Sequence, residues 1–301
     1  MEHTISDSNP SLEANRNATQ IIAVDGKIEC HLTVSNPDDR ILDPLATATG
    51  LSRQRLKQAM QKGAVWLTRG KQTTRIRRSS KSLKVNDQVH AYYDEEILAT
   101  EPTQCRLISD EDAYSVWYKP YGVRSQGSKW GDHCTIHRWV ELHLKPQRPV
   151  FTVHRLDRAA TGLMLIAHQK RVATKLAKLF EGRAIEKRYQ AIVHGPYPVD
   201  NSVRILDTDI DGRNAKSYVK GIAYDSEAGR SLVEVVIETG RKHQIRKHLS
   251  EIGLPVQGDR MYGRNGDVVD LQLAAVRLAF VCPVSGENKA YDLPEELKLS
   301  L

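Results

Sequence analysis

The sequence lacks the short motifs that mark most nucleotide-dependent enzymes and hydrolases. It has no GxGxxG after a strand, no GxxxxGK[ST], no HExxH and no GxSxG. The first two patterns cradle phosphates, and the other two supply a zinc site or a nucleophilic serine. Their absence removes the main support for those enzyme classes.

Cysteine is scarce, and its placement argues against metal and disulfide frameworks. The four cysteines lie far apart and form no CxxC pair, which suits a reducing, cytoplasmic setting. His133 and His137 could place two imidazoles four residues apart on a helix, beside Cys134. Because no further matched ligands lie nearby, we interpret them as surface or core residues and expect no metal and no cofactor.

Long apolar runs are also missing. No stretch approaches the roughly 18 apolar residues that a membrane span requires. The first twenty residues are polar, without the basic start and apolar run of a secretory signal. We therefore expect no membrane partner.

The composition is that of an ordinary globular protein. Of the 301 residues, 40% are apolar and 27% are charged. At about 150 residues per domain, this length predicts two domains.

The positive charge is concentrated in one segment. Between Arg40 and Tyr93 there are 12 basic residues and only two acidic ones, Asp43 and Asp87, although the whole chain carries just +7. Such a local excess is typical of a module that neutralises nucleic-acid phosphates. A solvated basic face is the alternative.

Helix signals within this segment favour the nucleic-acid interpretation. An apolar-periodic run ends at Gly50, and a second helix is predicted from the N-cap Ser52 to Gly63. Arg53 and Lys57 lie on the face opposite the apolar side chains, and Arg77 follows in a basic stretch after a short strand. Two short helices thus present a cationic face.

This segment resembles the alpha-L, or S-four-like, RNA-binding domain. The matching pieces are Leu42-Asp43, Ser52-Arg53, Gly63-Ala64-Val65 and Asn86-Asp87-Gln88-Val89, with departures at Ile41, Arg69 and Asn86. The resemblance assigns residues 40–100 to such a domain. Residues 1–39 are predicted to be a flexible lead, with at most one strand, at Gln20 to Val24.

The remaining residues, 101–301, are predicted to form an α+β domain. Apolar runs alternate in the manner of strands, whereas only two helices are clear, at Lys170 to Phe180 and His243 to Glu251. Without regular alternation of strands and helices, a doubly wound parallel sheet is disfavoured. We expect a mixed, largely antiparallel sheet with few helices.

Two segments of this domain are chemically unusual. One runs His154-Arg155-Leu156-Asp157-Arg158 and leads through Thr161-Gly162 into an apolar strand, and the other runs from Thr239 to Leu249 and is followed by Gly258 to Gly263. A carboxylate between two arginines stays ionised and can act as a nucleophile or base. A structural ion pair on a loop is an equally good interpretation of the residues alone.

Both segments resemble the RluA-type family of RNA pseudouridine synthases, whose hallmark is HRLDxxTSG before an apolar strand. The resemblance extends from about Val116 to Glu287, and its further motifs are Lys119-Pro120-x-Gly122, Lys187-Arg188-Tyr189-x-Ala191-x-Val193-x-Gly195 and Ala215-Lys216-Ser217. The sequence departs from the family pattern at Ala160, Thr161, Tyr118 and Ala274. The resemblance implies a pseudouridine synthase fold and an isomerisation that consumes no cofactor.

The resemblance also implies roles for single residues. Asp157 matches the catalytic aspartate, which attacks or deprotonates the ribose of the target uridine. Arg246 matches the arginine that pairs with this aspartate, and Tyr189 matches the tyrosine that lies against the uracil, where it stacks or accepts a proton. Because the reaction needs no activated water, a second carboxylate is not expected.

Other residues are expected to contact RNA. Arg155 matches the residue that fills the space left by the flipped base. The other candidates for substrate binding are Arg241, Lys242, His243, Gln244 and Lys119, together with Arg53, Lys57 and Arg77 of the basic segment. For Arg241, Lys242, His243 and Gln244, a structural role is at least as good an interpretation.

Several alternatives stay open at the level of sequence. The resemblance and the basic segment favour large-subunit ribosomal RNA as the substrate, with transfer RNA as the runner-up, and a monomer is our working expectation. A non-catalytic RNA-binding or ribosome-associated protein is the main rival. A nucleosidase that uses Asp157 to release free base is a further alternative.

Overall fold

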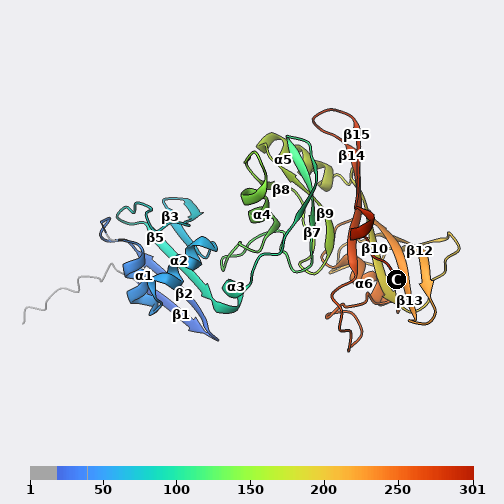
Figure 1. Ribbon diagram of the computed structural model, residues 1–301, viewed down its shortest axis with the longest axis horizontal. Coiled ribbons are helices and arrows are strands. Elements are labelled where there is room, and N and C mark those ends of the chain that lie inside the picture. Colours follow the sequence, from blue (N-terminus) through green and yellow to red (C-terminus); the bar gives the residue numbers. More distant parts are fainter. Residues whose placement is uncertain (1–18, 39) are drawn as a thin grey trace, which may run out of the picture. The chain divides into compact units, whose positions relative to one another are not determined.

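The protein was analysed as a computed structural model, which describes residues 19–38 and 40–301 (Figure 1). The described residues form two compact units: the first comprises those up to Thr100 together with Ser128–Asp132, and the second comprises Glu101–Gly127 and His133–Leu301. The lead predicted for residues 1–39 lies partly outside the described residues.

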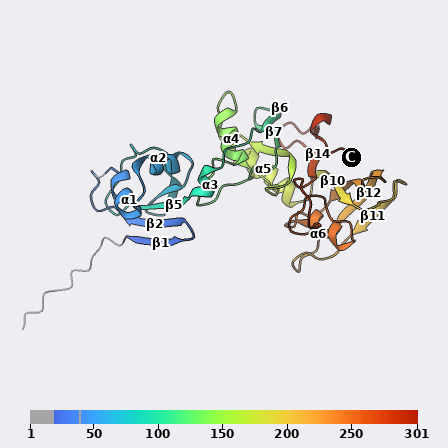
Figure 2. The same cartoon turned by 60° about the horizontal axis from the view of Figure 1, so that its bottom comes forward.

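The first unit is a five-stranded antiparallel sheet with helices packed on it. Its strands occur in the order β1-β2-β5-β3-β4. Helices α1 (Leu42–Thr49) and α2 (Arg53–Gln61) lie on one side of this sheet, as Figure 2 shows, and α3 is Glu95–Ala99. The strands are β1 (Gln20–Val24), β2 (Lys27–Thr33), β3 (Val65–Arg69), β4 (Gln72–Arg75) and β5 (Gln88–Asp94).

The predicted helix ends of this unit are confirmed. Gly50 adopts the left-handed conformation with φ 71° and closes α1, while the Ser52 side chain accepts a hydrogen bond from the Arg55 amide at 3.2 Å to begin α2. Leu45 and Leu56 are fully buried between the helices and the sheet. This packing leaves the basic face of α2 outward.

The start of this unit differs from the prediction. Residues 20–33 form a hairpin, β1 and β2, around Asp25 and Gly26, whose φ values of 50° and 75° are those that tight hairpin turns require. Strand β2 pairs along its whole length with β5, and Cys30 is completely buried. The strand predicted at Gln20 to Val24 is confirmed as β1. The flexible lead is wrong for Lys27–Thr33, because β2 supplies part of the core.

The second unit is built on a ten-stranded, mostly antiparallel sheet, which confirms the predicted α+β class. The main path runs β11-β12-β13-β10-β14-β9-β7-β6, with β15 pairing β14 and β8 pairing β9. The strands are β6 (Arg106–Asp110), β7 (Tyr114–Lys119), β8 (Phe151–Thr152), β9 (Thr161–Ala167), β10 (Glu186–His194), β11 (Val203–Leu206), β12 (Ser217–Asp225), β13 (Arg230–Ile237), β14 (Leu273–Val281) and β15 (Asn288–Asp292).

Three helices and a 3-10 turn complete this unit: α4 (Ile136–His143), α5 (Lys170–Glu181), α6 (Gln244–Glu251) and Glu295–Leu297. Val172 and Leu176 of α5 pack against β7, β9 and β14. Ile245 and Leu249 of α6 pack against β10 and β13. No helix within the described ranges is long and apolar enough to cross a membrane.

The two halves of the sheet meet where β9 runs parallel to β14. The pairing is short, Thr161 with Ala274 and Gly162 with Ala275. Gly162 has φ 114°, and a Cβ placed on it would lie 2.3 Å from the Ala275 carbonyl oxygen. Only glycine permits this approach of two backbones. The glycine of the unusual first segment therefore joins the half-sheets directly after the Asp157 loop.

Candidate active site

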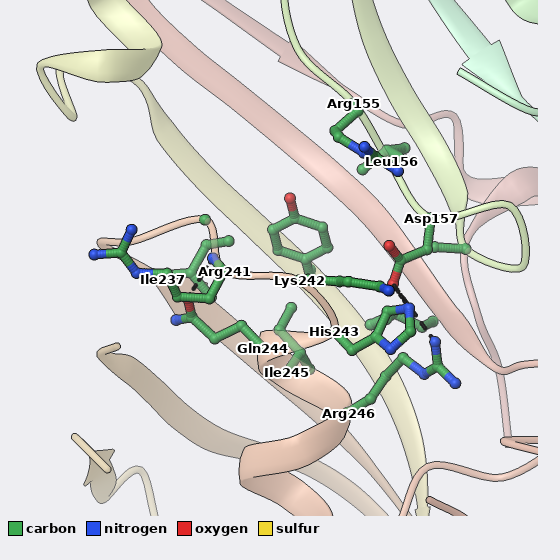
Figure 3. A pocket seen from close by; sticks show the side chains of 14 residues that line it. Arg155, Leu156, Asp157, Ile237, Arg241, Lys242, His243, Gln244, Ile245 and Arg246 are labelled. Carbon is green, nitrogen blue, oxygen red and sulfur yellow. Dashed lines mark hydrogen bonds and ion pairs between the residues drawn. The ribbon is translucent and has the colours of Figure 1, made fainter. Parts of the chain in front are cut away.

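A cavity of about 310 Å³ lies where β10, β13 and β14 meet the loop before β9 and the start of α6 (Figure 3). Its lining contains eight of the residues that the sequence predicted as catalytic or substrate-binding. These are Arg155, Asp157, Tyr189, Arg241, Lys242, His243, Gln244 and Arg246. Segments almost ninety residues apart in the chain are thus brought to one site.

The loop that carries Asp157 is fastened on both sides of that residue. Before it, the Ser125 hydroxyl donates to the Leu156 carbonyl at 2.7 Å and accepts from the Leu156 amide at 3.0 Å. After it, the Arg158 carbonyl accepts from the Gly122 amide at 3.0 Å. The side chain of Asp157 therefore projects from a fixed backbone, and it remains 24% exposed.

His154 anchors the same loop to β9. Its Nε2 accepts the Leu165 amide at 2.8 Å, and its ring stacks on Phe180 with centroids 4.3 Å apart. Burial, with a smaller contribution from Lys187, lowers the pKa of His154 to about 3. The imidazole is therefore neutral, as an acceptor nitrogen must be.

Arg246 connects Asp157 with a second, buried carboxylate. Its Nη1 lies 3.6 Å from Asp157 Oδ2, while its Nε and Nη2 donate to Asp259 at 2.7 and 2.6 Å. The Asp259 side chain is fully buried and also accepts the amides of Met261 and Tyr262. Burial alone would lower the pKa of Arg246, but the hydrogen bonds and charge of Asp259, together with the charge of Asp157, outweigh burial and raise this pKa.

This geometry refines the predicted partnership of Arg246. The sequence resemblance implied that Arg246 pairs with Asp157, whereas its bidentate partner is Asp259 and Asp157 lies at longer range. The guanidinium is fixed in the cavity wall by Asp259. Its remaining nitrogen faces Asp157, as Figure 3 shows. A cation that is preorganised in this way can orient the Asp157 carboxylate without moving from its own position.

His243 faces Asp157 from a strained position. It has φ 57°, its Nε2 lies 3.8 Å from Asp157 Oδ2, and its Nδ1 lies 3.0 Å from the Tyr262 hydroxyl. Burial lowers the pKa of His243, although Asp157 opposes the shift. The strained backbone at this point is the kind of feature that proteins keep at functional sites.

Gln244 belongs to the cavity wall, but its amide is used entirely within the chain. Its oxygen accepts from the Thr239 hydroxyl and the Arg241 amide at 2.7 and 3.0 Å, and its nitrogen donates to the Lys216 carbonyl and the Ser217 hydroxyl. The interpretation as a substrate-binding group is thereby corrected to a positioning role. Gln244 fixes the loop that carries Arg241, Lys242 and His243.

Tyr189 on β10 forms part of the floor of the cavity. Burial, together with the nearby Asp157 carboxylate, raises the pKa of Tyr189. The phenol therefore keeps its proton near neutral pH and offers an aromatic face and a hydroxyl.

The rim of the cavity is cationic. Arg155 and Lys242 are exposed, and Arg241 is held by a 2.9 Å bond from its Nε to the Asn214 carbonyl. Figure 3 shows Arg155 on the same loop as Asp157 and Lys242 on the segment that leads into α6. The acidic group at the centre is thus surrounded by positive charge, which suits a polyanionic substrate.

Two of the predicted substrate contacts are used elsewhere. Lys119 is completely buried and does not line the cavity. Its Nζ donates to the carbonyls of Pro120, Val123 and Arg158 at 3.1, 2.9 and 3.4 Å, and burial lowers its pKa to about 8. It is a brace for the Asp157 loop and not a substrate ligand. The basic residue was misassigned because a lysine is seldom expected in a core.

In the first unit, Arg77 is likewise occupied. Its guanidinium forms two bonds to Asp132, at 3.0 and 2.6 Å. Lys57 is exposed on α2, and Arg53 makes an exposed ion pair with Asp43 at 2.8 Å. Arg53 and Lys57 therefore remain candidates for RNA contact, whereas the prediction for Arg77 is corrected.

Sequence reasoning missed Asp259 and Tyr262 as members of this site. The segment from Gly258 to Gly263 was noticed as unusual, and that was the available signal. Its function became visible only when the fold placed it against α6.

Among the described residues, no group of three or more His, Cys, Asp or Glu side chains could hold a metal ion.

Comparison with known proteins finds similar RNA-modifying enzymes. Residues 113–251 match the family described as RNA pseudouridylate synthase. Together with relatives that are named RNA pseudouridine synthases, this match identifies the activity that the sequence resemblance implied. The enzyme is thus an isomerase that acts on RNA.

Relatives of the synthase span much of its length. An uncharacterised RNA pseudouridine synthase of Aquifex aeolicus is 28% identical, covering 87% of this chain and 92% of the relative. Ribosomal large subunit pseudouridine synthase D of Neisseria meningitidis is also 28% identical, covering 64% of this chain and 59% of the relative. Human RNA pseudouridylate synthase domain containing 1 shares the fold, with a TM-score of 0.55 at 21% identity over 65% of this chain and 86% of that one.

Proposed function

We propose that this synthase converts uridine to pseudouridine in large-subunit ribosomal RNA, with Asp157 as the catalytic carboxylate. The observation that carries the proposal is the position of Asp157: it is the carboxylate inside a cationic cavity, 3.6 Å from an arginine that Asp259 fixes. The Neisseria relative named for the ribosomal large subunit supports the choice of RNA.

In this mechanism the target nucleotide is flipped out of its stack into the cavity. Asp157 attacks or deprotonates the ribose, the bond from the sugar to N1 of uracil breaks, and the uracil turns within the cavity. A bond then forms between the sugar and carbon 5, and the proton on carbon 5 is lost while N1 gains one. The atoms balance without a co-reactant, so neither a metal nor a cofactor takes part.

The surrounding residues have supporting tasks in the proposal. Arg246 orients the Asp157 carboxylate. Tyr189 holds the turning uracil by stacking and by its hydroxyl, because its raised pKa makes an ionised phenolate a poor candidate for the proton acceptor. Arg155 fills the space that the flipped base vacates, and Arg241 and Lys242 meet phosphates.

The first unit is proposed to be an S-four-like RNA-binding domain. Its α2 presents Arg53 and Lys57 to solvent, on a segment where the basic residues far outnumber the acidic ones. Such a surface adds affinity that does not depend on sequence. We place the synthase in the cytoplasm as a monomer that meets structured RNA through this domain.

The test uses purified full-length protein on unmodified transcripts of large-subunit ribosomal RNA and of pooled transfer RNA from the same organism. Position-resolved mapping should find pseudouridine at one or a few sites of the ribosomal transcript. Modification of transfer RNA alone would replace the substrate, and release of free uracil would identify a nucleosidase instead. Binding to both transcripts with no product would favour a non-catalytic protein.

A further inference from the structure

A second cavity, of about 380 Å³, adjoins the catalytic one. The two share Arg155, Tyr189, Ile237, Gly240 and Arg241 in their linings, so Tyr189 lies between them. The second cavity is otherwise lined by residues from the loop before β9, the end of α5, the start of β10 and the loop after β13. Nothing in the proposed mechanism uses this space.

Its wall contains a largely buried lysine without a partner among the described residues. Lys187 is only 9% exposed, and no hydrogen bond or ion pair to its ammonium group occurs within residues 19–38 and 40–301. Burial, and the nearby charge of Arg183, lower the pKa of Lys187. The Nζ atom of Lys187 is not among the completely buried side-chain atoms that lack a partner, so the ammonium group opens onto the cavity. A cation largely removed from water costs stability unless a counter-charge meets it, so this position suits a ligand.

The contrast with Lys119 shows how unusual this is. Both lysines are at least nine-tenths buried, but Lys119 donates to three carbonyl groups of its own chain. The Nε2 atom of His154 cannot accept a hydrogen bond from Lys187, because it already accepts one from the Leu165 amide.

The charge of the cavity favours an anion. Lys187 is joined in the lining by Arg183, Arg155 and Arg241, against the two acidic residues Glu181 and Glu238. Glu238 is engaged by the Tyr218 hydroxyl. The net charge is therefore positive at a place closed on one side by protein, where an electrostatic attraction is stronger than on an open surface.

The position along β10 relates this cavity to the reaction. Lys187 and Tyr189 are two residues apart on one strand, so their side chains project to the same face, about 7 Å apart along the strand. The second cavity therefore adjoins the place where the uracil lies against Tyr189 in the proposed mechanism.

We propose that the Lys187 cavity binds the backbone phosphate next to the target uridine. The RNA strand enters across the shared wall at Arg155 and Arg241, and the phosphodiester takes the place of the counter-charge that the protein does not supply to Lys187. This subsite rests on the pseudouridine synthase activity and adds to it a fixed point for the strand beside the flipped nucleotide.

The first experiment replaces Lys187 by methionine, which has similar volume and no charge. Lys187→Met should raise the KM for RNA about tenfold, reduce the slope of log affinity against log salt by about 0.7, and leave single-turnover chemistry at saturating RNA within about twofold. Lys187→Arg should restore most of the affinity. Lys178→Met, an exposed lysine of α5, is the matched control and should behave as wild type.

Thermal unfolding separates a binding role from a structural one. Removing an unpartnered buried charge should raise the Tm of Lys187→Met by about 2–4 °C, whereas Lys119→Met should lower the Tm because three bonds are lost. A Lys187→Met protein that is less stable than wild type would show a structural lysine and overturn the proposal.

Modified RNA then locates the phosphate. In a short RNA that contains the uridine identified by mapping, one phosphate at a time on either side is replaced by an uncharged methylphosphonate. Wild type should lose about tenfold in affinity at one such position, and Lys187→Met should lose nothing further there. Equal losses in both proteins at every position would overturn the subsite. Absence of any product with wild-type protein would instead contradict the activity itself.

Discussion

Arg246 and Asp259 form a buried, bidentate ion pair, with Nε and Nη2 of the arginine 2.7 and 2.6 Å from the two carboxylate oxygens. The pair lies directly behind Asp157 in the cavity wall. It leaves one nitrogen of Arg246 facing the proposed catalytic group at 3.6 Å. The position of the cation is therefore set by a partner within the protein itself.

Breaking this pair should cost both stability and activity. Asp259→Asn keeps the shape of the side chain but leaves Arg246 buried without a counter-charge, so we expect a loss of about 3–5 kcal/mol in the free energy of unfolding. Product formation should fall about a hundredfold, because Arg246 loses its fixed orientation. Urea denaturation and single-turnover assays measure the two effects.

Asp292→Asn serves as the control for Asp259→Asn. Asp292 pairs with Arg277 at the surface, with 56% of its side chain exposed, and should contribute less than about 1 kcal/mol. Equal effects of the two substitutions would show that the buried pair has no special role.

Gly162 should tolerate no side chain. Gly162→Ala places a methyl group 2.3 Å from the Ala275 carbonyl oxygen and 2.4 Å from its amide nitrogen, at φ 114°. We expect a loss of at least about 3 kcal/mol in unfolding free energy or failure to fold, with loss of activity. Gly266→Ala, at φ 97° with no atom within 4 Å, should cost about 1 kcal/mol. Similar melting temperatures for the two variants would contradict the close approach of β9 and β14.

The neutral His154 should make the synthase sensitive to acid. Its pKa is about 3 in the folded protein and about 6.5 when unfolded, so the unfolded chain binds the extra proton between these values. Stability from this group is complete above about pH 6.5 and is lost as the pH falls towards 3, by up to about 4–5 kcal/mol. His154→Gln keeps an acceptor for Leu165 without titrating. The difference in unfolding free energy between wild type and this variant should therefore shrink between pH 7 and pH 4, and a constant difference would contradict the assignment.

Lys57 and Arg77 of the first unit should differ in how much each contributes to RNA affinity. Lys57→Gln removes an exposed charge and should reduce the salt slope of RNA affinity by about 0.7–0.9, and Arg53→Gln should act similarly. Arg77→Gln should leave the slope unchanged and lower stability, because its charge is engaged by Asp132. A fall in slope with Arg77→Gln as large as with Lys57→Gln would restore Arg77 to the RNA surface.

Local signals in the sequence were sufficient to predict structure where a single residue controls the backbone conformation. Gly50 ends α1 and Ser52 begins α2 as predicted. The role of Gly50 depends on its own φ, and the role of Ser52 depends on one neighbouring amide. The two unusual segments were also identified, and they meet at one cavity. The Asp25-Gly26 pair is a similar local signal for a hairpin turn, but the prediction of a flexible lead did not use it.

Partnerships between distant residues were harder to predict. The sequence does not indicate that Arg246 forms its tight ion pair with Asp259 and not with Asp157. Which carboxylate binds Arg246 depends on how α6 packs. Lys119 was assigned to substrate because its motif is shared with a family, yet it is buried under its own loop. Lys187 stood in a recognised motif without a role until its burial became visible.

The central claim is that Asp157 of this protein isomerises uridines in ribosomal RNA. The most direct measurement is a position-by-position pseudouridine map of ribosomal and transfer RNA from cells that lack the gene, rescued with wild type or with Asp157→Ala. Asp209→Asn, an exposed aspartate outside the cavity, is the control. We predict that one or a few sites in large-subunit RNA vanish, and that wild type and the control restore them while Asp157→Ala does not. Restoration of the same sites by Asp157→Ala would contradict the account.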